Sequence, residues 1–189
     1  MTDKEAVLSY LHEHLKPKRI THTLGVAETA CEMAARLGCD TEKAELAAYL
    51  HDAAKYMPTG EAFSLCEEAD IALDAWTRKT PEILHAPAGA ALAKLYFHET
   101  DEDIINAVLY HTTGRVGMSL LEKIIFLADM IEPNRRPFEA LDAIRGMWQT
   151  DLDAALVAAM DSSIRYVIQK GDYIHPDTVL ARNSLIKKQ

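Results

Sequence analysis

Residues 47–56 read Ala-Ala-Tyr-Leu-His-Asp-Ala-Ala-Lys-Tyr, and the fold predicted here is built around this stretch. It is small and apolar except for His51 and Asp52, which stand side by side, and for Lys55. An isolated carboxylate is costly to bury, so an aspartate in an apolar segment is normally paired or bound to a metal ion. The stretch therefore predicts the end of a helix that carries metal ligands into a protein core.

Two further residues of the same kind lie in other apolar segments. His22 opens a predicted helix, and Asp129 lies within the run Ile-Ile-Phe-Leu-Ala-Asp-Met-Ile. Each has an ordinary explanation when taken alone, because a histidine on an apolar face is usually a core residue and the Asp129 carboxylate could pair with Lys55 or Lys123. Imidazole and carboxylate ligands from separate helices suit iron, manganese or zinc. Together the residues favour one metal ion held in a helical bundle.

The composition favours an all-α protein. Of the 189 residues, 49% are hydrophobic and only 7% are aromatic, with many alanines and leucines, which is typical of helices. No stretch has a convincing strand pattern, and residues 70–86 are expected to be irregular. Apolar spacing and capping residues predict helices over 3–15, 20–37, 41–54, 61–69, 87–98, 102–111, 120–132, 138–147, 151–170 and 178–188.

The charge of the chain limits its partners. The formal net charge is −9 and the sequence pI is about 5.3, whereas proteins that bind nucleic-acid polymers usually carry a basic stripe. A nucleotide is compatible with this charge, since a metal ion and a few arginines can offset local phosphate charge. We therefore expect a small-molecule ligand and no nucleic-acid polymer.

The cysteines and the hydrophobic runs indicate a compartment. Three cysteines without a Cys-x-x-Cys pair are typical of reduced residues in the cytosol. No signal peptide is visible in the first residues, and no run approaches the roughly 20 apolar residues of a membrane span. We expect a soluble, cytoplasmic protein that does not bind a membrane.

The order His22, His51-Asp52, Asp129 resembles the signature of the HD-domain metal-dependent phosphohydrolases. Over residues 18–184 the chain also resembles the YqeK family, the bacterial symmetrical diadenosine tetraphosphate (Ap4A) hydrolases. The segments that carry this likeness are Arg19–Val26, Tyr49–Lys55, Leu84–Pro87, His111–Gly114, Ala128–Arg135, Gly171–Thr178 and Ala181–Asn183. One departure is Asn134, where the family pattern leads us to expect glycine, so the turn before Arg135 is in question.

The resemblance implies a fold and an activity. The fold would be an all-α HD-domain helical bundle, a single domain over 1–189 with a core of about 18–132. Additional C-terminal helices over 138–188 would pack on this core and close the nucleotide site. The activity would be symmetrical cleavage of Ap4A into two ADP, by in-line attack of a metal-activated water. Iron is the expected cofactor, with manganese or another divalent cation as alternatives, and the sequence leaves a homodimer open.

The resemblance also assigns residues. The metal ligands would be His22, His51, Asp52 and Asp129. The catalytic residues would be Lys55, His85, His111 and Arg135, with either His85 or His111 protonating the leaving oxygen or binding a second cation. The nucleotide-binding residues would be Arg19, Asp52, Ala53, Ala54, Lys55, His85, His111, Thr112, Arg135, Gly171, Asp172, Tyr173, Ile174, His175 and Pro176, of which the last six would hold the base and ribose.

Two other functions agree with the same four residues. One is hydrolysis of a different nucleotide, either a nucleoside monophosphate or a guanosine polyphosphate alarmone. The other is a non-catalytic helical sensor that binds a nucleotide and signals to a partner. A purely structural bundle fits worst, because it leaves His51 and Asp129 without a reason to stand in apolar segments.

Overall fold

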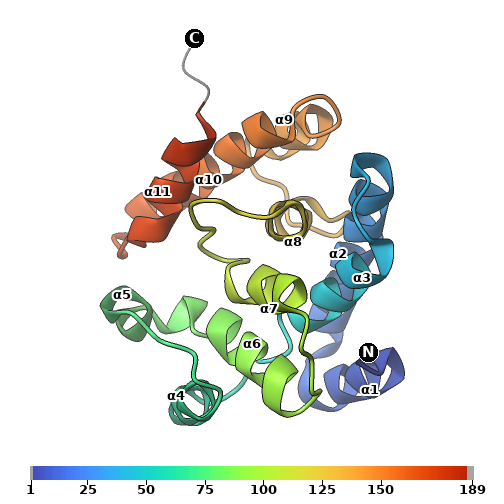
Figure 1. Ribbon diagram of the computed structural model, residues 1–189. Helices are drawn as coiled ribbons and strands as arrows, with labels where there is room; N and C mark the ends of the chain where they lie inside the picture. Colours follow the sequence, from blue (N-terminus) through green and yellow to red (C-terminus); the bar gives the residue numbers. More distant parts are fainter. Residues whose placement is uncertain (1, 187–189) are drawn as a thin grey trace.

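The structure is a computed structural model that describes residues 2–186, and within this range it contains helices and no strand (Figure 1). The predicted all-α fold is therefore confirmed. In chain order the elements are α1 (Lys4–His14), α2 (Pro17–Leu37), α3 (Thr41–Leu50), α4 (Thr59–Glu68), α5 (Ala75–Lys79), the 3-10 helix η1 (Pro81–Ile83), α6 (His85–Leu95), α7 (Glu102–Leu109), α8 (Leu120–Ile131), α9 (Leu141–Met147), α10 (Leu152–Lys170) and α11 (Pro176–Leu185).

Side-chain caps fix where several helices begin. The Asp40 carboxylate accepts hydrogen bonds from the backbone N–H groups of Glu42 and Lys43 at the start of α3. Asp101 begins α7 and Ser119 begins α8 in the same way. These caps satisfy N–H groups that have no partner inside a helix. Because such caps are local, the sequence predicted the beginnings of these helices well.

Four helices form the centre of the bundle. Helices α3 and α8 each contact α2, α7 and one another, and α6 packs against α7. Their buried side chains include Met33, Leu50, Ile124 and Leu127, each no more than 2% exposed. Helix α10 packs on α8 and carries α11, so the C-terminal helices lie far from α1 (Figure 1). None of the helices within residues 2–186 is long and apolar enough to cross a membrane.

The largest departure from the predicted helices lies at the central stretch. Helix α3 ends at Leu50 instead of continuing to residue 54, and residues 51–56 form successive turns. In these turns the N–H groups of Ala53 and Lys55 bond to carbonyls three residues back, those of Leu50 and Asp52. A helix that continued to residue 54 and the observed turns have the same hydrophobic spacing through Ala54. The spacing therefore could not locate the end of α3.

Two shorter differences have local causes. Residues 70–86, expected to be irregular, contain α5 and η1, because Asp74 caps α5 through the N–H groups of Trp76 and Thr77. Helix α11 begins at Pro176 instead of residue 178 and ends at Leu185, while the predicted end at residue 188 lies outside the described residues. A five-residue helix is too short to show a hydrophobic period, which explains why α5 was not predicted.

The turn at Gly114 yields a prediction about stability. Its φ is +67°, and a Cβ added there would lie 2.8 Å from Met160 Cε and 3.3 Å from Ala181 Cβ. We expect Gly114→Ala to lower the free energy of unfolding by about 1–3 kcal/mol, measured by urea titration. The matched control is Gly60→Ala in α4, where a Cβ meets nothing within 4 Å and stability should rise slightly. Equal stabilities for both variants would contradict the packing described here.

Candidate metal centre

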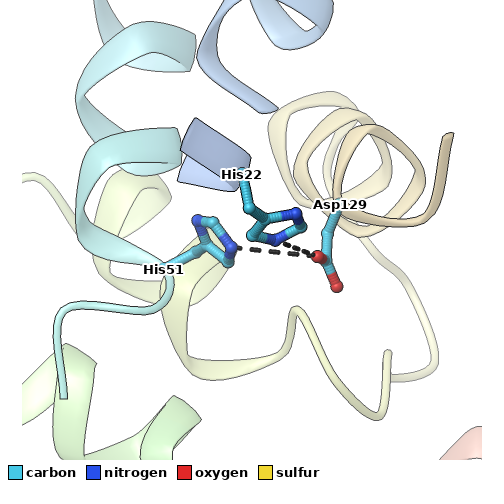
Figure 2. Close-up of side chains that lie close together, drawn as sticks. All are labelled: His22, His51 and Asp129. Atoms are coloured by element: carbon cyan, nitrogen blue, oxygen red, sulfur yellow. Dashed lines mark ion pairs between the residues drawn. The ribbon is translucent and has the colours of Figure 1, made fainter. Parts of the chain in front are cut away.

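The structure brings the four predicted ligand residues together from three segments. His22 comes from α2, His51 follows α3, and Asp129 comes from α8; Figure 2 shows both imidazoles directed at the aspartate. Nε2 of His22 and Nε2 of His51 lie 2.9 and 3.8 Å from Oδ1 of Asp129. Oδ2 of Asp52 lies 3.7 Å from Nε2 of His22 and 3.4 Å from Nε2 of His51.

The two imidazole rings are held by contacts on their far side. Nδ1 of His51 donates to the carbonyl oxygen of Ala48 at 2.6 Å, and Nδ1 of His22 donates to Oε1 of Glu132 at 3.0 Å. Because these acceptors fix the proton on Nδ1, each ring presents the lone pair of Nε2 toward the centre of the cluster. This orientation is the one that metal-binding histidines adopt.

Three buried atoms at this point lack a hydrogen-bond partner. Within the described chain, Nε2 of His22, Nε2 of His51 and Oδ1 of Asp52 make no hydrogen bond. An unsatisfied buried polar atom costs about 1–3 kcal/mol, so natural proteins rarely keep three of them together. All three are electron-pair donors, which is the chemistry that a bound cation requires. The donor set of nitrogen and oxygen atoms therefore fits a metal ion.

Both carboxylates of the cluster are ionised at neutral pH. Burial alone would raise the pKa of Asp52, but the neighbouring His51 and His85 hold it well below its usual value. Burial would likewise raise the pKa of Asp129, but His22, His51 and Arg135 together lower it strongly. The cluster thus offers two anionic ligands as well as two imidazoles.

His85 and His111 form a second group with Asp52. Nε2 of His85 and Nε2 of His111 lie 3.1 and 3.9 Å from Oδ1 of Asp52, and 3.2 Å from each other. Their Nδ1 atoms face the carbonyl oxygens of Glu82 and Val108, at 2.8 and 2.7 Å, so the Nε2 lone pairs converge. Burial lowers the pKa of His111 to about 3, which keeps this imidazole neutral and able to bind a cation.

Three basic side chains surround the two groups. Nη1 of Arg19 lies 2.7 Å from Oδ2 of Asp52, and Nη1 of Arg135 lies 3.6 Å from Oδ1 of Asp129. Nζ of Lys55 lies 3.0 Å from Nε2 of His85 and 3.5 Å from Oδ1 of Asp52. All three side chains are partly exposed, so they can also meet an anionic ligand that approaches the cluster.

The predicted salt-bridge alternative for Asp129 does not agree with these contacts. Lys123 pairs with Asp153 at 2.7 Å, and Lys55 lies against Asp52 and His85 instead. Within residues 2–186, the basic side chains that lie within 4 Å of the Asp129 carboxylate are His22, His51 and Arg135.

The predicted nucleotide loop lies beside α5. Nε2 of His175 lies 3.1 Å from the Asp74 carboxylate and 3.2 Å from the Thr77 hydroxyl. The rings of Tyr173 and Trp76, both exposed, are tilted by 60° to each other at a centroid distance of 5.8 Å. In the part of the chain that the structure describes, no hydrogen bond or ion pair joins residues 171–176 to the four ligand residues.

The other predicted nucleotide residues are divided between two cavities and the core. Ala54, Lys55 and His85 line one cavity, Thr112 and His175 line another, and Ala53 is buried in the hydrophobic core.

Sequence reasoning missed Glu132 as part of this centre. Its side chain is 1% exposed, holds His22, and accepts a hydrogen bond from the backbone N–H of Asn134. Gly25 makes room for it, because a Cβ there would lie 2.6 Å from Oε2 of Glu132. The sequence feature that could have indicated Glu132 is its position, a carboxylate directly after the apolar run of α8. Asn134 is not among the residues with positive φ, so this turn does not need the glycine that the family pattern suggested.

Comparisons with known proteins agree with this geometry. The profile described as "HD domain" matches residues 19–134. Two relatives are each named "Bis(5'-nucleosyl)-tetraphosphatase, symmetrical". That of Bacillus subtilis (strain 168) is 40% identical over 97% of this chain and 98% of the relative. That of Halalkalibacterium halodurans is 42% identical over 96% of both chains.

A solved structure is also similar to this chain. It is the crystal structure of a protein from Clostridium acetobutylicum described as a predicted HD superfamily hydrolase involved in NAD metabolism. It superposes with a TM-score of 0.92 at 41% identity, covering 98% of this chain and 97% of that one.

The contact between Glu132 and His22 yields a prediction about metal affinity. Glu132→Ala leaves the His22 ring free to rotate, so we expect the affinity for Mn²⁺ to fall by about 10- to 100-fold, measured by competition with a chelator. Glu132→Gln keeps an acceptor for Nδ1 and should lose less. Glu139→Ala, at an exposed position after α8, is the control. An unchanged affinity in Glu132→Ala would show that this contact does not orient a ligand.

Proposed function

This chain belongs to the HD domain family, and from that premise we propose that it hydrolyses Ap4A symmetrically into two ADP. The two relatives named as symmetrical tetraphosphatases match it over almost their whole length, which supports this choice among nucleotide hydrolases. The HD-superfamily hydrolase from Clostridium acetobutylicum supports the same class of reaction. The substrate would be a small dinucleoside polyphosphate and the product ADP.

The observation that carries the proposal is the group of buried atoms that make no hydrogen bond. Nε2 of His22, Nε2 of His51 and Oδ1 of Asp52 are oriented inward and make no hydrogen bond within the described residues. We propose that these residues and Asp129 hold a cation, with iron preferred and manganese or another divalent cation as substitutes. Bound there, it would polarise a phosphoryl oxygen and lower the pKa of water toward neutrality.

The basic residues around the cluster would bind the phosphates. Arg19 and Arg135 present planar guanidinium groups that match phosphate oxygens, and Lys55 contributes a compact positive charge. In this proposal water attacks in line between the second and third phosphates, and these three side chains offset the charge on the transferred phosphoryl group and the departing ADP. Each contacts a carboxylate or an imidazole of the centre, which supports this role.

His85 and His111 have two alternative roles in this scheme. Their convergent Nε2 atoms beside Oδ1 of Asp52 suit a second cation, and the low pKa of His111 makes it a poor proton donor at neutral pH. The other role is protonation of the leaving oxygen by His85; it requires a protonated imidazole, which burial and the Lys55 ammonium 3.0 Å away disfavour by lowering the pKa of His85. The metal content of the purified protein, one or two ions per chain, distinguishes the two roles.

Residues 171–176 would hold the base and ribose of one nucleotide. Tyr173 is exposed next to Trp76, which offers aromatic surface for a base, and His175 lines a cavity shared with Thr112. Since this loop joins α10 to α11, we propose that the C-terminal helices complete the nucleotide site of a single domain. A cytoplasmic location is part of the proposal, and a homodimer stays open.

The metal ligands can be tested by substitution. We expect His51→Ala, and separately Asp129→Ala, to lose bound metal and to hydrolyse Ap4A at the background rate, because each removes a ligand from the cluster. The exposed His12→Ala is a control for loss of a histidine and should keep both properties. Metal analysis and turnover are measured on the same preparations. Full activity in a variant that binds no metal would overturn the proposed mechanism.

The substrate can be tested by chromatography of the reaction products. Protein loaded with iron or manganese should convert Ap4A to ADP alone. Formation of AMP and ATP would show asymmetrical cleavage and contradict the proposal. Inert Ap4A beside a hydrolysed nucleoside monophosphate or guanosine polyphosphate would indicate the other hydrolase function. Tight nucleotide binding without turnover of any of these would indicate a sensor.

A further inference from the structure

Two cavities open on the surface next to the second histidine group. The first, of about 270 Å³, has walls from residues 54–62 and 81–85, and we call it the α4 cavity. The second, of about 200 Å³, has walls from residues 72–77, 83–87, 109–113 and 175–177, and we call it the loop cavity. Each is smaller than the roughly 300–1,000 Å³ of a site for a drug-sized ligand. A dinucleotide would therefore need both.

The two cavities lie on either side of residues that neighbour the same pair of imidazoles. His85 lines the α4 cavity, and Thr112, which follows His111 directly, lines the loop cavity. Nε2 of His85 and Nε2 of His111 are 3.2 Å apart, beside Asp52. Residues 81–87, which carry His85, therefore border both cavities, the α4 cavity through Glu82 and Leu84 and the loop cavity through Ile83 and Pro87. A substrate that is cut at its centre into equal halves needs this arrangement.

The lining of the α4 cavity matches a nucleoside linked to phosphate. Ala54, Ala62 and Leu84, each 3% exposed, form an apolar floor on which a base can lie. The two alanines belong to a small hydrophobic cluster, and their short side chains leave space above it. At one end Lys55 stands beside Asp52 and offers its ammonium group to phosphate. The exposed carboxylate of Glu82 is placed at the rim, where it can accept hydrogen bonds from ribose hydroxyls.

We infer that the α4 cavity holds the second nucleoside of the dinucleotide, while the loop cavity and residues 171–176 hold the first. This inference rests on the proposed function and adds a binding site to it. In the product state one ADP would lie on each side of the cleavage point. Each chain would then have two separate binding sites for ADP, which differ in their linings.

Calorimetric titration of ADP into the full chain loaded with Mn²⁺ tests this inference. We expect two ADP per chain for the wild type. Ala62→Leu, which fills the floor of the α4 cavity, should bind one ADP and should raise the KM for Ap4A. The matched control is Ser64→Leu on the exposed face of the same helix, which should still bind two.

A second variant covers the case in which Ala62→Leu does not fold. Glu82→Ala alters only an exposed side chain, since the Glu82 carbonyl that holds His85 is retained. It should weaken one of the two ADP sites by about tenfold, as expected for loss of a hydrogen bond to a charged group.

The outcomes separate this inference from the proposed function. A wild-type chain that cleaves Ap4A but binds a single ADP overturns the α4 cavity as a nucleoside site and leaves the hydrolase standing. Two ADP sites that neither Ala62→Leu nor Glu82→Ala alters overturn it as well. A chain that binds two ADP, loses one in Ala62→Leu, and cleaves no Ap4A supports the cavity and contradicts the hydrolase.

Discussion

The burial of one carboxylate, that of Asp52, is the constraint on which this structure depends. The side chain is 2% exposed, and removing such a group from water costs several kcal/mol unless it is paired. Its Oδ2 atom faces His22, His51 and Arg19, while its Oδ1 atom faces His85, His111 and Lys55. That list of neighbours covers both groups of candidate ligands. The same carboxylate therefore belongs to both, and the helices around it are arranged to bring compensating groups to its two oxygens.

Much of the fold could be predicted from the sequence, because the decisive signals are local. The aspartate and serine caps of α3, α7 and α8 and the left-handed Gly38 after α2 mark helix ends within a few residues. The end of α3 at Leu50 could not be located in this way. Alanines at 53 and 54 pack equally well from a helix or from tight turns, so only the tertiary position of His51 and Asp52 distinguishes the two. Helix α5 depends on the cap at Asp74 and is too short for periodicity to show it.

The convergence of His22, His51, Asp52 and Asp129 could be anticipated because polar residues in apolar helices need partners. The sequence could not predict which residues hold these ligands from their far side. Glu132 follows Asp129 by one helical turn, yet nothing local shows that it reaches across to His22 on α2. The neighbours of residues 171–176 were likewise beyond prediction, since Asp74 and Thr77 lie about a hundred residues away in the chain. Contacts of that range depend on how whole helices pack.

The position of the candidate ligands has a consequence for the stability and the lifetime of the protein in the cell. The three segments that meet at Asp129 lie far apart in the sequence, so an ion bound among them would act as a crosslink (Figure 2). An ion that binds only the folded chain, present at a hundred times its dissociation constant, adds about 2.7 kcal/mol to the folded state. A cell starved of that ion would then be left with a protein that is easier to unfold and to degrade. Abundance, as well as turnover, would follow the supply of metal.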